Sequence, residues 1–572
     1  MEDGSMKTAI VFFRKENKPL AEKLACQPCL GRTSLYFFSD HDPGLTGQLW
    51  KEVSLFLFIG SLGIVTRMIG PHLEDKRTDP GVLCVDQAGT WCIPVTGGHA
   101  RHVNRLAREL TVVEGMQPVI TTAGDNQGTI GPEELALRLG CRLEGNRNSL
   151  KMIACMLLEG KRVPLWYREP LVPPEFPGYE RKLLGETLPG GPPLLVLSDR
   201  IEPIPDAVFL RPPSLVVGTG FRSSTSMREL ENAIQHFLAQ CGYSKASLAE
   251  IATLDRKVQS LSPLEARWGT KLTGFTSEEI RSVNGTTHSP CAQKHLDIPG
   301  VCEPVLTLRK ADCLVGKTVY QGITLSLGRL AWKKKGKLSL VSLGPGPIDL
   351  LTPRALAALE ESDFILGYRT YLDSLPERFR YRIVSTGNFM GQEKMRMKKA
   401  LELVQEGNAV AVVSSGDVGV FGMAAPGVEM ALRAGIPLQI IPGVTASLWA
   451  ASLLGSPLVN GFTAISLSDY LVPWENILRD LTHAVKTGLP LALYNIVERN
   501  RQTKINTLQS IVMKYRGPQT LVGVVRKDSS REITSIRELD IATLTMQTIL
   551  IIGSAKTAEH SGYLVTERGY TL

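Results

Sequence analysis

Apolar positions along the first part of the chain fall in short runs of strand length, and a stretch of helical period lies between them. The apolar runs cover residues 7–13, 53–59, 82–85 and 118–122. The stretch of helical period covers residues 104–110. Strands that alternate with helical patterns are typical of a parallel sheet with helices packed on its faces. The pattern therefore predicts an α/β layer over about residues 6–135.

The pattern changes twice before the middle of the chain. Residues 136–210 are rich in proline and only weakly periodic, which indicates either a small subdomain or a connector. From residue 214 to about 330 the α/β pattern returns, with a buried strand, a glycine turn and a helix. Ser224, Thr225 or Ser226 is expected to cap this helix. Its apolar stripe is predicted to be Met227, Leu230, Ile234, Phe237 and Leu238.

The last segment, residues 338–572, follows a cluster of lysines at 333–337 that we interpret as a solvated linker. Its first helix is expected to begin after Thr352 as N-cap, with a proline at the first helical position. Alternating strands and helices continue from there, for example strands at 409–413 and 438–442. We therefore predict a multidomain α/β protein.

Length and charge narrow the function classes. At roughly 150 residues per domain, 572 residues predict about three to four domains, and 43% hydrophobic with 21% charged residues is typical of a globular chain. The formal net charge is +8, but no basic stretch is interleaved with aromatic residues. This balance favours acidic small molecules over nucleic acid as binding partners.

Neither a membrane span nor a metal site is expected. The early apolar run at residues 55–65 is broken by small residues and is too short for a bilayer, and the first residues lack a signal-peptide pattern. Ten cysteines in such a chain indicate reduced thiols and a cytoplasmic location. Cys26 and Cys29 form one CxxC, but no second pair follows at zinc-site spacing, so no metal is predicted.

Candidate chemistry in the last segment lies in four turns that each follow an apolar strand. Their sequences are LVSLGPGP, VAVVSSGDVG, LQIIPGVTAS and LALYNI. Glycine turns at the carboxyl edge of a sheet let backbone amides approach a ligand. The four turns resemble those of tetrapyrrole methyltransferases that use S-adenosylmethionine, and residues 338–572 look most like the precorrin-3B or cobalt-factor III C17-methyltransferases. The resemblance implies two αβα lobes with the cofactor in the cleft between them.

The resemblance also implies which residues form that cleft. Pro345 and Gly346 would border it. The methionine part of S-adenosylmethionine would contact Gly416, Asp417, Val420 and Phe421, and the adenosine end would contact Thr445, Ala446 and Asn495. Asp417 has an alternative role, in which it holds the loop by accepting backbone amides. Methyl transfer from a sulfonium needs little beyond positioning, so no nucleophilic side chain is required.

The first 310 residues carry a second set of motifs, which includes DKRTDP, IPVTGGHARHVN, VGTGFRSSTS and GVCEPVL. In this order they resemble cobalt-precorrin-5A hydrolases, which implies that a lactone is opened and acetaldehyde released. Lys76, Arg77 and Asp79 would grip substrate carboxylates, or alternatively form a solvated charged loop. The remaining candidates are His99 as general base, Glu303 as a second acid/base group, and Arg222 as a substrate-binding residue.

Two hypotheses remain, because the histidine motif departs from the family's usual SGHxGGAN. In the first, the chain is bifunctional: it methylates C17 with ring contraction, and it opens the lactone of cobalt-precorrin-5A. In the second, it is a methyltransferase whose N-terminal half binds tetrapyrrole without catalysis. In both, the substrate is a tetrapyrrole, and we expect a homodimer formed through the methyltransferase domain.

Overall fold

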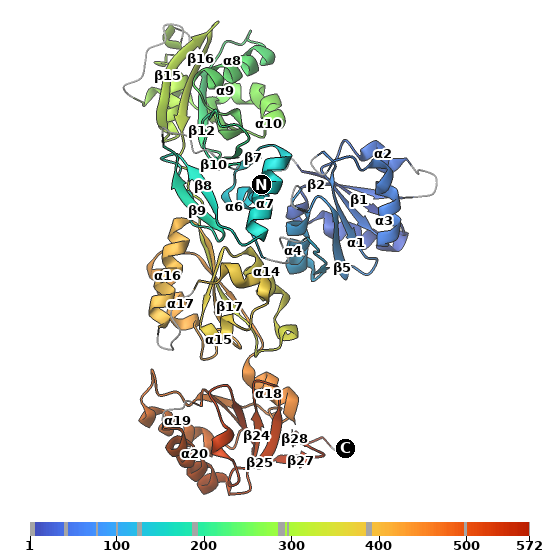
Figure 1. The fold of residues 1–572 in the computed structure, drawn as a ribbon, viewed down its shortest axis with the longest axis vertical. Coiled ribbons are helices and arrows are strands. Elements are labelled where there is room, and N and C mark those ends of the chain that lie inside the picture. Colours follow the sequence, from blue (N-terminus) through green and yellow to red (C-terminus); the bar gives the residue numbers. More distant parts are fainter. Residues whose placement is uncertain are drawn as a thin grey trace. The chain divides into compact units, whose positions relative to one another are not determined.

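The computed structural model describes residues 6–38, 44–75, 78–98, 101–122, 128–185, 191, 193–283, 292–294, 297–384, 392–496 and 500–570. The chain divides into two compact units. The first contains residues 1–336, 377–381 and 406–408, and the second contains residues 337–376, 382–405 and 409–572. Figure 1 shows the elements of both units along the chain.

The first sheet is buried on both faces. Alternate strand residues such as Ile10 and Leu57 pack against α1 and α4, while Val11 and Phe58 face α3. The strands follow the order β2-β1-β3-β4-β5-β6. Its elements are β1 (Lys7–Phe12), α1 (Lys18–Ala25), β2 (Arg32–Phe37), α2 (Leu45–Leu49), β3 (Leu55–Ile59), α3 (Leu62–Ile69), β4 (Gly81–Val85), β5 (Trp91–Thr96), α4 (Val103–Glu114) and β6 (Gln117–Pro118).

The predicted parallel layer is confirmed for β2, β1, β3 and β4, but β5 runs antiparallel to β4. Only a short turn joins these two strands, and a parallel neighbour needs a much longer crossover. The carboxylate of Asp86 holds the turn by accepting hydrogen bonds from the backbone amides of Thr90 and Trp91, at 2.6 and 2.7 Å. The strand predicted at 118–122 was wrong, because regular pairing ends at Pro118.

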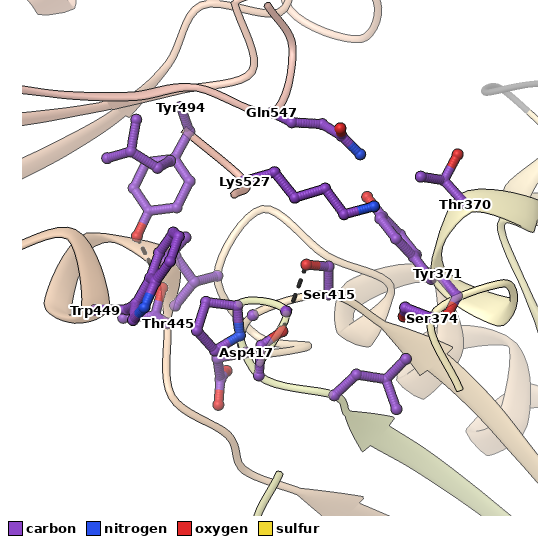
Figure 2. Close-up of a pocket in the computed structure, with 18 of the residues that line it drawn as sticks. Thr370, Tyr371, Ser374, Ser415, Asp417, Thr445, Trp449, Tyr494, Lys527 and Gln547 are labelled. Carbon is purple, nitrogen blue, oxygen red and sulfur yellow. Dashed lines mark hydrogen bonds between the residues drawn. The ribbon is translucent and has the colours of Figure 1, made fainter. Parts of the chain in front are cut away.

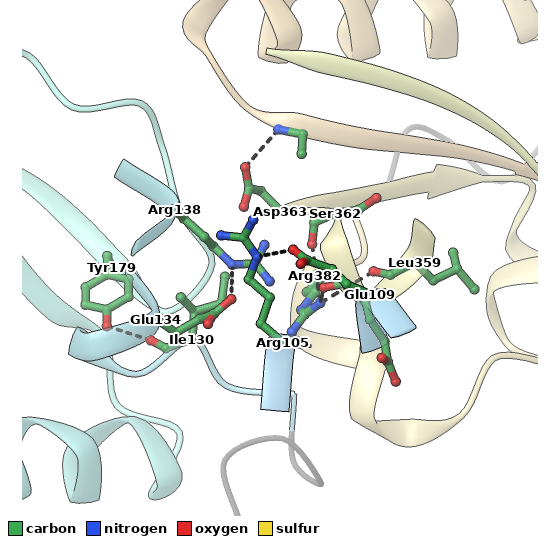
Figure 3. Close-up of polar contacts among 12 residues, drawn as sticks. Arg105, Glu109, Ile130, Glu134, Arg138, Tyr179, Leu359, Ser362, Asp363 and Arg382 are labelled. Carbon is green, nitrogen blue, oxygen red and sulfur yellow. Dashed lines mark hydrogen bonds and ion pairs between the residues drawn. The ribbon is translucent and has the colours of Figure 1, made fainter. Parts of the chain in front are cut away.

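The proline-rich segment has a sheet and a core of its own. Helices α6 and α7 pack on strands in the order β7-β11-β10-β8-β9. The Tyr179 hydroxyl donates a hydrogen bond to the carbonyl of Ile130 (2.6 Å), and Arg138 pairs with Glu134 along α6, as Figure 3 shows. The elements are α6 (Pro132–Leu139), β7 (Arg142–Glu144), α7 (Arg147–Leu158), β8 (Val163–Tyr167), β9 (Tyr179–Leu183), β10 (Leu195–Leu197) and β11 (Val208–Arg211).

The third sheet confirms the predicted helix after its first strand. Ser226 caps α8 and forms a capping box with Glu229, and the predicted stripe packs into the core. The strand order is β14-β13-β12-β16-β15. The elements are β12 (Leu215–Gly220), α8 (Met227–Gln240), β13 (Leu248–Leu254), α9 (Asp255–Val258), α10 (Ser262–Trp268), β14 (Lys271–Phe275), α11 (Ser277–Arg281), α13 (Cys302–Leu308), β15 (Asp312–Tyr320) and β16 (Ile323–Arg329).

The second unit begins with a parallel sheet in the order β18-β19-β17-β20. Thr352 caps α14 by accepting a hydrogen bond from the Ala355 amide (3.2 Å), as predicted. At the other end of α14, the Arg382 guanidinium donates to the carbonyl of Glu360 (2.7 Å). The elements are β17 (Lys337–Ser342), α14 (Pro353–Glu361), β18 (Phe364–Gly367), α15 (Arg369–Leu372), α16 (Glu393–Glu406), β19 (Ala409–Ser414), α17 (Ala424–Arg433) and β20 (Leu438–Ile441).

The rest of this unit is a mixed sheet in the order β22-β23-β26-β24-β25, with α18 on one face and α19 and α20 on the other. A small sheet, β21-β28-β27, accompanies it. The elements are α18 (Ala446–Leu454), β21 (Gly455–Ser456), β22 (Thr463–Ser466), α19 (Trp474–Lys486), β23 (Leu491–Tyr494), α20 (Arg501–Arg516), β24 (Leu521–Val525), β25 (Arg531–Ser535), β26 (Ile549–Ile552), β27 (Thr557–His560) and β28 (Tyr563–Thr566). The chain is therefore a multidomain α/β protein, as predicted.

Short 3₁₀ helices complete the fold, at Lys15–Asn17, Pro28–Leu30, Gly70–His72, Lys245–Ser247, Gln259–Leu261, Ile348–Leu350, Glu377–Arg382 and Ile541–Thr543. Among the residues that the structure describes, no helix is both long enough and apolar enough to span a bilayer.

The lysine cluster is not simply a solvated linker. Residues 331–336 have no regular structure, as expected, but exposed and half-buried side chains alternate along them. Trp332 packs against the core of the proline-rich segment, and the Lys334 ammonium lies 5.3 Å from the centre of the Phe176 ring. The Trp332 ring and the apolar part of the Lys334 side chain therefore hold residues 331–336 against the protein, although the charges of this segment alone predict that it is solvated.

The reactivity of the cysteine thiols tests the packing of β4 against β5. Burial raises the pKa of Cys84 to about 11 and that of Cys92 to about 12, whereas Cys26 and Cys155 are exposed. Because only the thiolate reacts, we expect iodoacetamide at a pH of about 8, near the ordinary thiol pKa, to alkylate Cys26 and Cys155 before Cys84 and Cys92. Peptide mass spectrometry measures the order. Equal labelling of all four in the native protein would contradict the packing of β4 against β5.

Candidate active site

An open cleft in the second unit is lined by loops from its two larger sheets (Figure 2). Its volume is about 1190 Å³ when the space at its mouth is counted. The turns after β17 and β19, the start of α18 and the residue after β23 all reach it. The nine residues that the sequence predicts for a cofactor cleft all line it: Pro345, Gly346, Gly416, Asp417, Val420, Phe421, Thr445, Ala446 and Asn495.

Three glycine turns meet at the floor of the cleft. Gly344 and Gly416 exchange backbone hydrogen bonds, with N···O distances of 3.1 and 2.6 Å. Gly443, after β20, fits closely against them, because a Cβ atom there would lie 2.5 Å from Ser342 Cβ and 2.9 Å from the Gly416 carbonyl oxygen. The third turn therefore needs glycine for close approach, and the carboxyl ends of β17, β19 and β20 converge.

Asp417 ties two of these turns together. Its Oδ1 accepts a hydrogen bond from the Gly419 amide (2.8 Å), and its Oδ2 accepts one from the Gly443 amide (2.9 Å). These contacts are those of the loop-holding role that the sequence left as an alternative. The side chain also lines the cleft, so the same carboxylate shapes the surface that a ligand would meet.

Removing this carboxylate is expected to weaken ligand binding while the chain stays folded. Asp417→Ala frees two backbone amides, and hydrogen bonds to a charged group contribute about 1.5–3 kcal/mol each. We expect S-adenosylhomocysteine to bind at least about tenfold more weakly, with an intermediate loss for Asp417→Asn, which keeps one acceptor. Isothermal titration calorimetry measures both. Wild-type affinity in Asp417→Ala would show that the loop geometry does not depend on this carboxylate.

Two non-glycine residues at the cleft have left-handed backbone. Phe421 has φ 54° and Asn495 has φ 56°. Such conformations cost about 1–3 kcal/mol each and cluster at ligand sites. The Phe421 ring, 49% exposed, lies 5.1 Å from the Tyr494 ring, whose hydroxyl accepts from the Ser447 amide (2.9 Å) and bonds Thr445 Oγ1 (2.8 Å). The strained backbone of Phe421 and Asn495 and the exposed Phe421 ring favour ligand binding at this end of the cleft.

The sequence missed several other side chains that line the cleft. They are Tyr368, Thr370, Tyr371, Trp449, Tyr494, Lys527 and Gln547. Burial, and then the neighbouring Tyr368 at 5.3 Å between ring centres, raises the pKa of Tyr371, so its phenol stays protonated near neutral pH. Apart from Tyr494, which belongs to the LALYNI motif, these residues lie outside the four turns, and no local pattern in the sequence distinguishes them. Only the packing of the two sheets brings them together.

The N-terminal candidates are less fully described. His99, Lys76 and Arg77 lie outside the described residues. Asp79 is buried, and its carboxylate accepts a hydrogen bond from the Glu74 amide (3.0 Å) while Arg101 Nε donates to its carbonyl (3.0 Å). Asp79 therefore holds the backbone at Glu74, and its carboxylate is already bonded to that amide.

The other two candidates, Arg222 and Glu303, lie on different elements and contact the β15–β16 hairpin at different points. The exposed Arg222 follows β12 and lies beside Gly322, where its Nε would be 3.6 Å from a Cβ. Glu303 begins α13, and its Oε1 accepts a hydrogen bond from the Lys317 amide (2.9 Å). Glu303 therefore fastens α13 to β15.

The fold and the cleft define a two-lobed α/β enzyme of the tetrapyrrole methylase class. The family of Tetrapyrrole (Corrin/Porphyrin) Methylases matches residues 337–544. The families Cobalamin synthesis G N-terminal and Cobalamin synthesis G C-terminus match residues 44–125 and 215–328. Each part of the chain thus has its own relatives.

Curated relatives agree with this division. The chain is 36% identical over 247 residues to the "Cobalt-factor III methyltransferase" of Priestia megaterium, covering 41% of this chain and 45% of that protein. It thus spans about half of that relative's length. It is 35% identical over 243 residues to the "Probable cobalt-factor III C(17)-methyltransferase" of Salmonella typhimurium, covering 41% of this chain and all of that protein. The "Cobalt-precorrin-5A hydrolase" of Priestia megaterium is 29% identical over 318 residues, covering 52% of this chain and 84% of that protein.

The chain therefore belongs to the tetrapyrrole methylase family, in its cobalt-factor III C17-methyltransferase branch, and carries an N-terminal cobalamin synthesis G region homologous to cobalt-precorrin-5A hydrolase.

Proposed function

We propose that the cleft transfers a methyl group from S-adenosylmethionine to C17 of a tetrapyrrole, precorrin-3B or cobalt-factor III, with contraction of the ring. The observation that carries this proposal is the convergence of all nine predicted residues on one cleft. The identity to a C17-methyltransferase along that relative's whole length supports it.

The residues of the cleft suit this cofactor. Glycine turns offer backbone groups at close range, and Leu343, Val420 and Ile549 give apolar walls. The rings of Phe421, Tyr494 and Trp449 favour a cation such as a sulfonium. When bound, the cofactor supplies a methyl group that is already activated for transfer.

The chain's own contribution is positioning. The Gly344–Gly416 bridge and the two Asp417 bonds fix the floor of the cleft before any ligand enters. Preorganised geometry lowers the entropy cost of bringing two reactants in line, and apolar walls exclude water. In the proposal, Gly416, Asp417, Val420 and Phe421 surround the methionine part, while Thr445, Ala446 and Asn495 hold the adenosine end.

Calorimetry tests the cofactor assignment directly. The full-length chain is expected to bind one S-adenosylhomocysteine per chain, and Phe421→Ala is expected to weaken that binding. If the wild-type chain does not bind S-adenosylhomocysteine, the proposed function is wrong.

We further infer that the N-terminal half opens the lactone of cobalt-precorrin-5A and releases acetaldehyde. Homology to the hydrolase over most of its length supports this second activity. In it, His99 activates water, Glu303 is the second acid/base candidate, and Lys76, Arg77, Asp79 and Arg222 bind substrate carboxylates. The existing bonds of Asp79 and Glu303 to backbone amides favour holding roles for these two.

An acetaldehyde assay on the wild-type chain decides between the two hypotheses for this half. Release from cobalt-precorrin-5A supports a bifunctional enzyme. Tetrapyrrole binding without release would support the alternative, a monofunctional methyltransferase with a non-catalytic N-terminal half. A homodimer through the methyltransferase domain is also part of the proposal, and light scattering on the purified chain measures it.

A further inference from the structure

Lys527 supplies the cationic side chain of the cleft. Of the described residues that line the cleft, it alone carries a positive charge. It lies in the turn between β24 and β25 and is exposed. Figure 2 shows its side chain extending into the cleft, with the amine directed toward the wall that carries Thr370 and Tyr371.

The neighbouring charges in this turn are already paired, and Lys527 is not. Arg526 forms an ion pair with Glu532 (2.8 Å), and the Asp528 carboxylate accepts hydrogen bonds from the amide and hydroxyl of Ser530 (3.0 and 2.6 Å). Within the described part of the chain, no carboxylate lies within ion-pair distance of Lys527. The hairpin thus satisfies its other charges internally and presents this ammonium to the cleft.

The other titratable groups of the cleft cannot bind an anion in this way. Asp417 is an acid bonded to two backbone amides, and the Tyr494 hydroxyl is bonded to Thr445 and Ser447. Tyr371 stays a neutral phenol, which can donate a hydrogen bond but carries no charge. An anionic ligand group in the described part of the cleft therefore has one charged partner.

We propose that Lys527 anchors a side-chain carboxylate of the macrocycle, with Thr370 and Tyr371 on the wall it faces. The assignment rests on the proposed function, since tetrapyrroles of this class carry several acetate and propionate groups. The carboxylate of the methionine part of S-adenosylmethionine is the competing anion, and the Kd measurement below distinguishes the two. An ammonium and a carboxylate form a charge-assisted hydrogen bond, which is shorter and stronger than a neutral one. One fixed carboxylate sets which ring carbon faces the methyl donor, so Lys527 is a positioning residue.

Chemical footprinting of the full-length chain tests this anchor without turnover. Lysine acetylation is mapped by mass spectrometry with and without cobalt-factor III, in the absence of S-adenosylmethionine. Acetylation of Lys527 is expected to slow several-fold when cobalt-factor III is present, and the protection should weaken at high salt. Lys556, exposed in a loop outside the cleft, serves as the internal control and should react at the same rate in both samples. Equal rates at Lys527 with and without cobalt-factor III would overturn the anchor.

The kinetics of two Lys527 variants distinguish the effect of its charge from the effect of its size. Lys527→Met should raise the KM for cobalt-factor III about tenfold or more. Lys527→Arg keeps the positive charge and should raise this KM much less. The Kd for S-adenosylhomocysteine should not change in either variant. A wild-type KM in Lys527→Met would contradict the proposal. If the wild-type chain transfers no methyl group while cobalt-factor III still protects Lys527, the anchor stands and the proposed reaction fails.

Discussion

Replacing Gly443 by alanine is expected to disable the proposed cofactor cleft. The added methyl group would meet Ser342 Cβ at 2.5 Å and the Gly416 carbonyl oxygen at 2.9 Å, and neither atom is the end of a flexible side chain. Overpacking of this kind costs about 1–3 kcal/mol. If the turns separate to relieve it, affinity for S-adenosylhomocysteine should fall about tenfold to a hundredfold, and Gly443→Val should be worse.

Calorimetry on the purified variants measures this loss. Gly70→Ala is the matched control, because its backbone is right-handed and a Cβ there meets nothing within 4 Å. The control should bind S-adenosylhomocysteine like the wild type. Unchanged binding by Gly443→Ala would mean that the three turns do not form the cofactor floor.

His99→Ala is expected to abolish acetaldehyde release and to spare methyl transfer. A general base contributes about 10² to 10⁴ in rate, so its removal should reduce release by a factor in that range. Methylation should persist because the proposed methyl-transfer cleft belongs to the other compact unit of the chain. Both products are assayed side by side on the same preparation of cobalt-precorrin substrates.

His102→Ala is the control for this variant, because the motif GGHARHVN contains two histidines. Loss of release in His102→Ala but not in His99→Ala would move the base to the second histidine. Normal release in both variants would leave Glu303 as the remaining candidate. Simultaneous loss of methylation would contradict the division of the two activities between the two units.

Local sequence signals predicted those features that a few neighbouring residues determine. The cap and apolar stripe of α8 and the Thr352 cap of α14 formed as expected, because each depends on side chains within one or two turns. The glycine turns also follow their strands as predicted. The grouping of the nine cleft residues came from the resemblance to the tetrapyrrole methyltransferases, and all nine line one cleft.

Features that depend on distant contacts were not predictable in this way. The contact of Lys334 depends on Phe176, which is far away in the sequence. Lys527 and Tyr371 reach the cleft only because separate sheets pack around it. The loop-holding bonds of Asp79 and Glu303 were likewise hidden, because a carboxylate in a motif gives no sign of which amide it will meet.

Methyl transfer by the full-length chain tests the central claim most directly. The chain is incubated with cobalt-factor III and S-adenosylmethionine that carries a labelled methyl group, and the macrocycle is analysed by mass spectrometry. The account predicts a product with one labelled methyl group from the wild-type chain, and much less from Gly443→Ala at the same cofactor concentration. A wild-type chain that binds S-adenosylhomocysteine yet transfers no label to the macrocycle would contradict it.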